Sequence, residues 1–108
     1  MRRPVILCLS QGGLGLAKTM AKVVDGDVHG LASRCPDAPF QFADTIAHIA
    51  GLFVAGRPVI GICAAAILIR ALAPHLGQKH HDAPVLAIAD DGSSIVPLLG
   101  LHLSLIHI

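Results

Sequence analysis

Aromatic residues are scarce in this sequence, which has no tryptophan or tyrosine and only 3 phenylalanines among its 108 residues. Charge is also sparse, because 8 basic and 7 acidic residues leave a net charge of +1, and the basic residues are scattered. Without a basic stripe or an aromatic platform, nothing supports nucleic-acid binding. A hydrophobic content of 54% against 14% charged residues excludes a disordered chain. The length suits one domain with one core.

Long hydrophobic runs are missing as well. The most apolar region, 46–73, is interrupted by charged residues and a proline, and its longest uncharged run is 58–69. That run is well short of the roughly 18 residues that indicate a membrane span. The apolar stretch near the start is too short for a signal peptide. We therefore expect no membrane partner.

The cysteines do not form a disulfide framework. Cys8, Cys35 and Cys63 are odd in number and irregular in spacing, which predicts reduced thiols and a cytoplasmic protein. Metal motifs are absent too. His80 and His81 are sequence neighbours, which rarely point at one ion, and no second ligand pair has suitable spacing, so we expect no metal.

Two nucleotide-binding motifs are excluded at the glycine-rich stretch 10–15. Gly13 and Gly15 match the first two glycines of a dinucleotide fingerprint, but Lys18 stands where a third small residue is needed. No Gly-Lys-Ser/Thr follows, so the stretch is not a P-loop either. It can form a tight turn, or it can bind an anion through its backbone N–H groups.

What the sequence does contain is an alternation of short apolar runs with helical patterns. This alternation predicts an α/β fold with three layers and an open, mostly parallel, Rossmann-like sheet, which we expect to be incomplete at its C-terminal end. Pro97 restricts the last strand to an edge or a bulge. Residues 33–42 are interpreted as an irregular crossing. The expected strands are Pro4–Leu9, Asp27–Leu31, Pro58–Ile62, Pro84–Ala89 and Ile95–Leu99.

Three helices are expected. The first is Leu14–Val24, and the third begins with Cys63–Ala66 and ends near Leu72. The second begins at a cap formed by Asp44 or Thr45 and ends near Gly56. Its face toward the sheet is expected to consist of Ile46, Ile49, Ala50 and Phe53.

The segment 57–72 joins a buried strand directly to a helix. Its alanines leave room for a ligand near the unpaired N–H groups of the first helical turn. Alternatively, the small residues only let the helix pack closely on the sheet. The loops 10–15, 62–66 and 90–94 all follow carboxyl ends of strands, where ligands of such sheets bind. We expect them to meet at one rim and to bind a ligand that carries carboxylates.

Several segments together point to a known family: DTI at 44–46, GRPVIGICAAAILIRALAP, DAPVLAIADDGSSIVPLLG, and His102, with Gly15-Leu16-Ala17 in the first turn. They resemble the N-terminal domain of the cobalt-precorrin-5A hydrolase (CbiG-type) family of cobalamin biosynthesis. The stretch ADDGSSIVPLLG is most similar to the form of this family that is fused ahead of a precorrin-3B C(17)-methyltransferase in some bacteria.

The resemblance implies an enzyme of corrin-ring synthesis. Such a hydrolase opens the ring-A δ-lactone of cobalt-precorrin-5A and releases a two-carbon unit as acetaldehyde. The expected partners are this cobalt-precorrin tetrapyrrole and downstream domains of the same chain. No cofactor is implied for this domain, whereas a fused methyltransferase domain would use S-adenosylmethionine.

The residues expected to bind substrate lie in the three loops and the adjoining helix. Cys63–Ala66, Arg70 and Gly92 are included because they match the family's motifs by position. Gly13, Gly15 and Ser93 are included because they lie in the predicted loops. They are Gly13, Gly15, Cys63, Ala64, Ala65, Ala66, Arg70, Gly92 and Ser93.

The resemblance assigns no catalytic residue. On chemical grounds, Asp90 or Asp91 can orient water and His102 can act as a general base. Cys63 is expected to have a lowered thiol pKa at a helix N-terminus. It is not assigned as a nucleophile, because the family accepts other residues at this position.

The C-terminal end departs from the family pattern. Leu101 replaces a second glycine, and LSLIHI at 103–108 matches the in-frame translation of a transposon end used in sequencing libraries. We therefore expect residues 1–102 to be an incomplete domain and 103–108 to be non-native. This fragment alone is expected to be inactive.

Three functions stay open at this point. The first is the leading domain of a corrin-pathway hydrolase. The second is a non-catalytic module that docks the tetrapyrrole for a fused partner. The third is a generic nucleotide-binding α/β domain, against which the incomplete glycine motifs argue.

Overall fold

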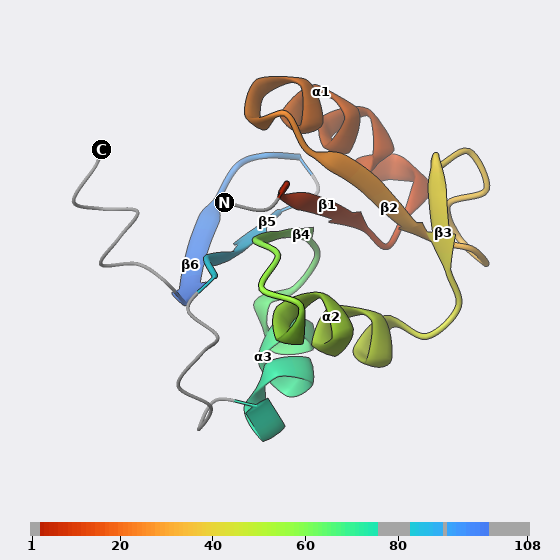
Figure 1. Ribbon diagram of the computed structural model, residues 1–108. Helices are drawn as coiled ribbons and strands as arrows, with labels where there is room; N and C mark the ends of the chain where they lie inside the picture. The colour runs from red at the N-terminus through yellow and green to blue at the C-terminus, as the bar shows by residue number, and fades with distance from the viewer. Residues whose placement is uncertain (1–2, 76–82, 90, 100–108) are drawn as a thin grey trace.

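A computed structural model describes residues 3–75, 83–89 and 91–99 of the chain and has an α/β fold (Figure 1). Strands and helices alternate along most of the chain, and in two places one strand follows another without a helix between them. The elements are β1 (Val5–Cys8), η1 (Gln11–Gly13), α1 (Leu14–Val24), β2 (Asp27–Leu31), β3 (Phe40–Phe42), α2 (Thr45–Val54), β4 (Val59–Ile62), α3 (Ala65–Leu72), η2 (Ala73–His75), β5 (Val85–Ile88) and β6 (Ile95–Leu99).

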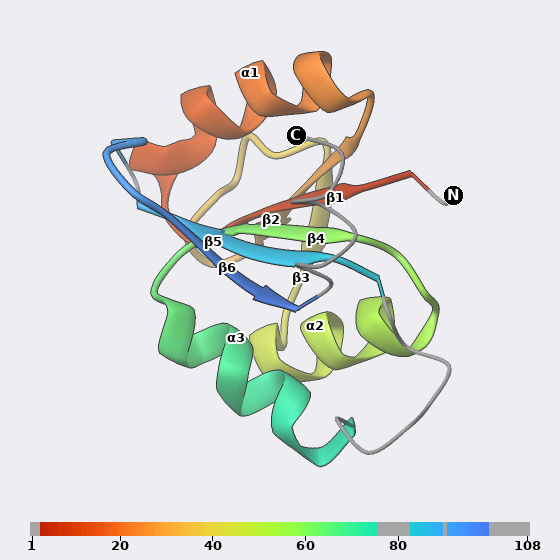
Figure 2. The same ribbon diagram turned by 90° about the vertical axis from the view of Figure 1, so that its left-hand side faces the viewer.

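The strands form one six-stranded sheet in the order β3-β2-β1-β4-β5-β6. β1 to β5 are parallel, and β6 runs antiparallel to β5. Helix α1 covers one face of the sheet, while α2 and α3 cover the other (Figure 2). The predicted three-layer, mostly parallel sheet is thus confirmed. The strand order reverses between β1 and β4, which start the two halves of the sheet.

The two central strands, β1 and β4, are buried along their whole length. Their apolar runs VILC and VIGI suit this place, because a strand covered on both faces cannot alternate with polar residues. Side chains from one face, such as Val5 and Val59, pack with Ile49 and Leu68 of α2 and α3. Those from the other face pack with α1. The two helical layers therefore depend on these two strands.

The structure corrects three expectations of the sequence analysis. Helix α3 begins at Ala65, because Ala64 is extended and serves as the N-cap, so Cys63 precedes the helix. The stretch interpreted as irregular, 33–42, contains strand β3 at its end. In α2, Leu52 is buried in place of Ile46, which is 36% exposed.

The position of the last strand, β6, is the one expected from Pro97. β6 is an edge strand, and its pairing with β5 is irregular between Val85 and Leu86, next to the pairing of Leu86 with Pro97. The expectation of an edge or a bulge is confirmed. Within the described residues, no helix is long and apolar enough to cross a membrane.

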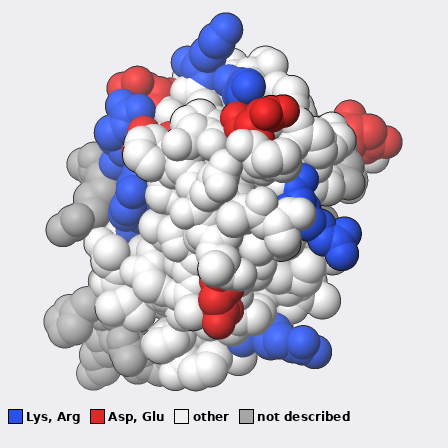
Figure 3. All heavy atoms as spheres, turned by 90° about the vertical axis from the view of Figure 1, so that its right-hand side faces the viewer, with Lys and Arg blue, Asp and Glu red and all other residues white. Residues whose placement is uncertain are grey.

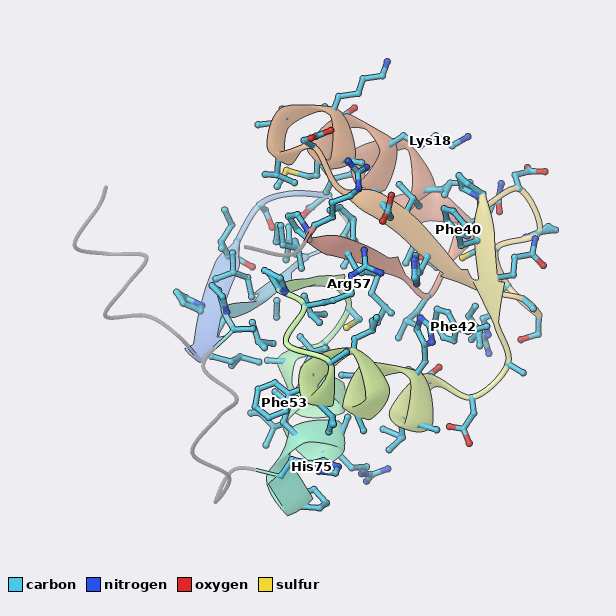
Figure 4. All side chains as sticks on the ribbon, viewed as in Figure 1. Lys18, Phe40, Phe42, Phe53, Arg57 and His75 are labelled. Atoms are coloured by element: carbon cyan, nitrogen blue, oxygen red, sulfur yellow. The ribbon has the colours of Figure 1, made fainter. Side chains whose placement is uncertain are left out.

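Ion pairs join the amino ends of three neighbouring strands. Arg57, just before β4, donates from Nη2 to Asp27 at 2.7 Å and from Nε to the carbonyl of Arg3 at 3.0 Å. Arg3 in turn donates to Asp27 at 3.0 Å. These hydrogen bonds lower the pKa of Asp27, with Arg3 as the larger cause. Arg57 marks this end of the sheet in Figure 4.

Charge is otherwise dispersed on the surface near β3. Figure 3 shows small separate groups of acidic and basic side chains around a broad uncharged area. This view fits the balanced net charge of +1.

A cluster of imidazole and phenyl rings links β2, β3 and α2. His29 Nδ1 and His48 Nε2 lie 2.8 Å apart, within hydrogen-bond distance. His48 also stacks on Phe42 with ring centroids 4.4 Å apart, and Phe40 lies beside His29 (Figure 4). Burial is the main cause that lowers the pKa of both histidines, and the cation of Arg57 acts in the same direction. The neighbouring His48 also lowers the pKa of His29, which Asp27 opposes.

The loop after β2 packs tightly on that strand at Gly30. A Cβ atom on Gly30 would lie 2.5 Å from the Cβ of Ala38 and 2.8 Å from the Cβ of Cys35. Only glycine lets the loop approach this closely. The contact holds Cys35 and Ala38 in the core beneath α1.

We expect acid to destabilise the protein through the histidine pair. The unfolded histidines, with a pKa near 6.5, take up protons at a higher pH than the folded pair. The free energy of unfolding should therefore fall as the pH drops below that value. Urea unfolding at a series of pH values measures this. His48→Phe keeps a ring against Phe42 but should cost about 1 kcal/mol near neutral pH and make the pH dependence shallower. An equally steep dependence in the variant would contradict the assignment.

A second prediction concerns the tight contact at Gly30. Gly30→Ala should reduce the free energy of unfolding by about 1–3 kcal/mol, because the loop must move away from β2. Gly51→Ala is the matched control, since a Cβ there meets nothing within 4 Å in helix α2. The control should stabilise the protein by about 0.5–1 kcal/mol. Equal effects of the two variants in denaturant titrations would show that the loop is not tightly packed.

Candidate functional site

Three loops meet at the carboxyl ends of the central strands. The loops after β1 and β4 and the turn between β5 and β6 lie together at one end of the sheet (Figure 2). β1 and β4 are the neighbours at which the strand order reverses. In open α/β sheets this position separates the two loops and leaves a crevice for ligands.

A pocket of about 670 Å³ occupies this position. Most of its lining is apolar and consists mainly of small or branched side chains. Three serines and one carboxylate make up the polar part of the lining. The apolar lining residues are Leu9, Ile62, Cys63, Ala64, Ala65, Ile67, Ala87, Ala89 and Val96, and the polar ones are Ser10, Asp91, Ser93 and Ser94. The convergence of loops expected from the sequence is therefore present.

The N-terminus of α3 borders the pocket. The first N–H groups of a helix have no acceptor within the helix and carry the positive end of its dipole. Ala64, the N-cap, has no side chain that can accept from them. Because Ala64 and Ala65 are small, a ligand can come close to this helix end. The arrangement can bind an anionic or carbonyl oxygen.

The turn between β5 and β6 fixes the carboxylate of Asp91. The amide of Gly92 donates to the carbonyl of Ala89 at 2.8 Å, and that of Ala89 donates to Ser94 at 3.1 Å. Gly92 has a φ of +77°, which favours glycine in this turn. Asp91 Oδ1 accepts from the amide of Ser93 at 2.9 Å. Hydrogen bonds from the side chain and the backbone of Ser93 lower the pKa of Asp91, so this carboxylate is ionised at neutral pH.

The residues expected to bind substrate divide into two groups. Five line the pocket or belong to its turn: Cys63, Ala64, Ala65, Gly92 and Ser93. The other four do not line it: Gly13 is buried at the end of η1, Gly15 is exposed in α1, and Ala66 and Arg70 are exposed on α3.

Of the residues expected to be catalytic, Asp91 lies on the pocket. Asp90 and His102 lie outside the described residues, as do Leu101 and the tail at 103–108. In the described part of the chain, no three histidine, cysteine, aspartate or glutamate side chains are grouped so that they could hold a metal ion.

Sequence reasoning missed Ser10 and Ser94, which are hydroxyl groups of the rim. Both lie in loops that the sequence had indicated: Ser10 is two residues after the end of β1, and Ser94 directly precedes β6, so their position was the available signal. The apolar lining residues Leu9, Ile67 and Val96 gave no signal, because a pocket wall has the same composition as a core.

The geometry of the turn leads to a prediction for Asp91. Ser93→Ala removes the side-chain hydrogen bond and should raise the pKa of Asp91 toward its ordinary value. NMR titration of the side-chain carboxyl carbon measures this pKa directly. Ser94→Ala is the control and should leave it unchanged. A pKa of Asp91 that is equal in both variants would exclude the role of the Ser93 hydroxyl.

Comparison with known proteins gave one family. Residues 47–105, more than half of the chain, match the family described as cobalamin synthesis G N-terminal. This match includes β4, α3 and the β5–β6 turn. It begins after Gly15-Leu16-Ala17 and after the DTI segment at 44–46, and for these two segments the resemblance stays a prediction. Neither the curated proteins nor the solved structures gave a match. The chain therefore belongs to the cobalamin synthesis G N-terminal family and has a role in cobalamin biosynthesis.

Proposed function

We propose that this domain binds a cobalt-precorrin at the pocket and takes part in opening the ring-A δ-lactone of cobalt-precorrin-5A. The observation that carries the proposal is the position of the pocket within the family's own segment. Its walls come largely from β4, α3 and the β5–β6 turn, all of which lie between residues 47 and 105.

The apolar side chains and the backbone N–H groups at the start of α3 suit different parts of such a ligand. The apolar wall around Ala64, Ala65 and Ile67 can pack against the edge of a macrocycle. The N–H groups at the start of α3 can donate to an acetate, a propionate or the lactone carbonyl. During hydrolysis, the same groups would stabilise the negative charge that develops on the carbonyl oxygen.

Asp91 is suited to orienting water. Its lowered pKa makes it a weak base, because the strength of a general base rises with its pKa. It can nevertheless accept a hydrogen bond from a water molecule and direct the oxygen toward the lactone carbonyl. Asp90 or His102 would then remove the proton as water adds. The acyl C–O bond of the lactone then breaks, which leaves a carboxylic acid and a hydroxyl group on the two-carbon unit. As this hydroxyl loses its proton, the carbon–carbon bond to the macrocycle would break, the macrocycle would keep the electron pair and take up a proton, and the unit would leave as acetaldehyde.

We place this reaction in the cytoplasm, where cysteines without a disulfide framework stay reduced. The domain would require no cofactor, and its partners would be the tetrapyrrole and further domains of the same chain. If one of these is a precorrin-3B C(17)-methyltransferase, S-adenosylmethionine would serve that domain.

A docking role without hydrolysis is the second candidate. It is favoured by the composition of the pocket, in which Asp91 is the one ionisable carboxylate among the lining residues of the described chain. The two candidates differ in one product, because docking alone releases no acetaldehyde.

The experiment incubates cobalt-precorrin-5A with the intact protein that carries this domain and measures acetaldehyde. Ala64→Leu places a larger side chain in the pocket and should lower acetaldehyde release at limiting substrate by about tenfold, equivalent to ~1.4 kcal/mol of binding. Ala47→Leu is the matched control on the exposed side of α2 and should leave the rate unchanged.

The outcomes separate the candidates. Tetrapyrrole binding that weakens in Ala64→Leu, without acetaldehyde from either protein, would favour docking. Equal binding and equal rates in Ala64→Leu and Ala47→Leu would exclude the pocket as the substrate site.

A further inference from the structure

Two buried thiols lie in contact beneath the loop that borders the pocket. The Sγ atoms of Cys8, at the end of β1, and Cys35, in the loop after β2, are 3.6 Å apart. Both side chains are 0% exposed. These residues are 27 positions apart in the chain, and the fold brings them together in the core beneath α1.

Each thiol donates a hydrogen bond to the backbone near the pocket. Cys8 Sγ donates to the carbonyl of Ser10 at 2.9 Å, and Cys35 Sγ donates to the carbonyl of Cys8 at 3.4 Å. Ser10 lines the pocket, and its carbonyl also accepts from the amide of Gly13 at 3.1 Å. The thiol protons thus help to fix the loop after β1.

From this geometry we infer that Cys8 and Cys35 form a reversible disulfide in the presence of peroxide and that this bond loosens the loop beside the pocket. A disulfide needs the two sulfur atoms about 2.05 Å apart. The sulfurs must therefore approach by about 1.5 Å.

The chemistry balances with one peroxide molecule. One thiol gives up its proton and its sulfur attacks peroxide, so that the O–O bond breaks and an S–O bond forms. The displaced hydroxide takes up this proton and leaves as water, and the sulfur becomes a sulfenic acid. The second thiol gives up its proton and attacks the sulfenic sulfur, so that the S–S bond forms and the S–O bond breaks. The hydroxide displaced there takes up the second proton and leaves as a second water. Two thiols are oxidised and peroxide is reduced to two waters. An external thiol reverses the reaction by exchange.

The consequence for the loop follows from the lost protons. A disulfide has no S–H group, so the carbonyls of Cys8 and Ser10 each lose a donor. Both cysteines are 0% exposed, so an oxidant reaches them only through a brief opening of the core, which admits peroxide more readily than a larger molecule. Cys63, which is partly exposed, is open to larger reagents.

The first test treats the chain carrying Cys63→Ser with hydrogen peroxide, so that Cys8 and Cys35 are the two remaining cysteines. Lys18 and Arg34 place them on separate tryptic peptides. Mass spectrometry should find these peptides joined within one chain, lighter by two hydrogen atoms, and separated again by dithiothreitol. Cys35→Ala in the same background is the control and should give no joined peptides. Thiols that remain intact, or that proceed to sulfinic acid without joining, would overturn the inference.

The second test measures amide hydrogen exchange before and after oxidation. Exchange at Gly13, whose amide donates to Ser10, should become several-fold faster in the disulfide form. Ala55 is the reference, because its amide donates to Gly51 in α2 on the other face of the sheet. A disulfide that forms while exchange at Gly13 stays unchanged would disprove the coupling to the loop.

Discussion

Burial of β1 and β4 on both faces is the constraint on which the structure depends. Each strand has four residues without polar side chains, and all four are buried. Such strands need helices above and below, which α1 on one side and α2 with α3 on the other provide. Because the connections leave the two strands toward opposite faces, the loops at their carboxyl ends separate. The pocket is a result of this separation.

The pocket therefore owes its position to the sheet and its chemistry to the loops. The strands bring the start of α3 and the β5–β6 turn to one rim, while small residues such as Ala64 keep the helix end accessible. Asp91 is oriented by its own turn, through Ser93, and does not rely on the core. Binding groups on loops and positions set by strands are the usual division in α/β proteins.

Apolar runs and helix caps made most of the fold predictable from the sequence. Asp44 caps α2 as expected, and Pro97 lies in an edge strand. β3 was missed, because a three-residue strand close to prolines has no periodicity to detect. Strand order could not be predicted, since it depends on contacts between residues distant in sequence. In the site, the loops were predictable, but Ser10 and Ser94 were not distinguished from ordinary turn residues.

The two ends of the sheet have different tasks. Arg3, Asp27 and Arg57 join the starts of β1, β2 and β4, at the end of the sheet opposite to the pocket. Substitutions in the loops at the pocket leave this anchorage untouched. In such a protein, loop residues can change during evolution so that new ligands bind, while the ion pairs at the other end of the sheet keep the strands in place.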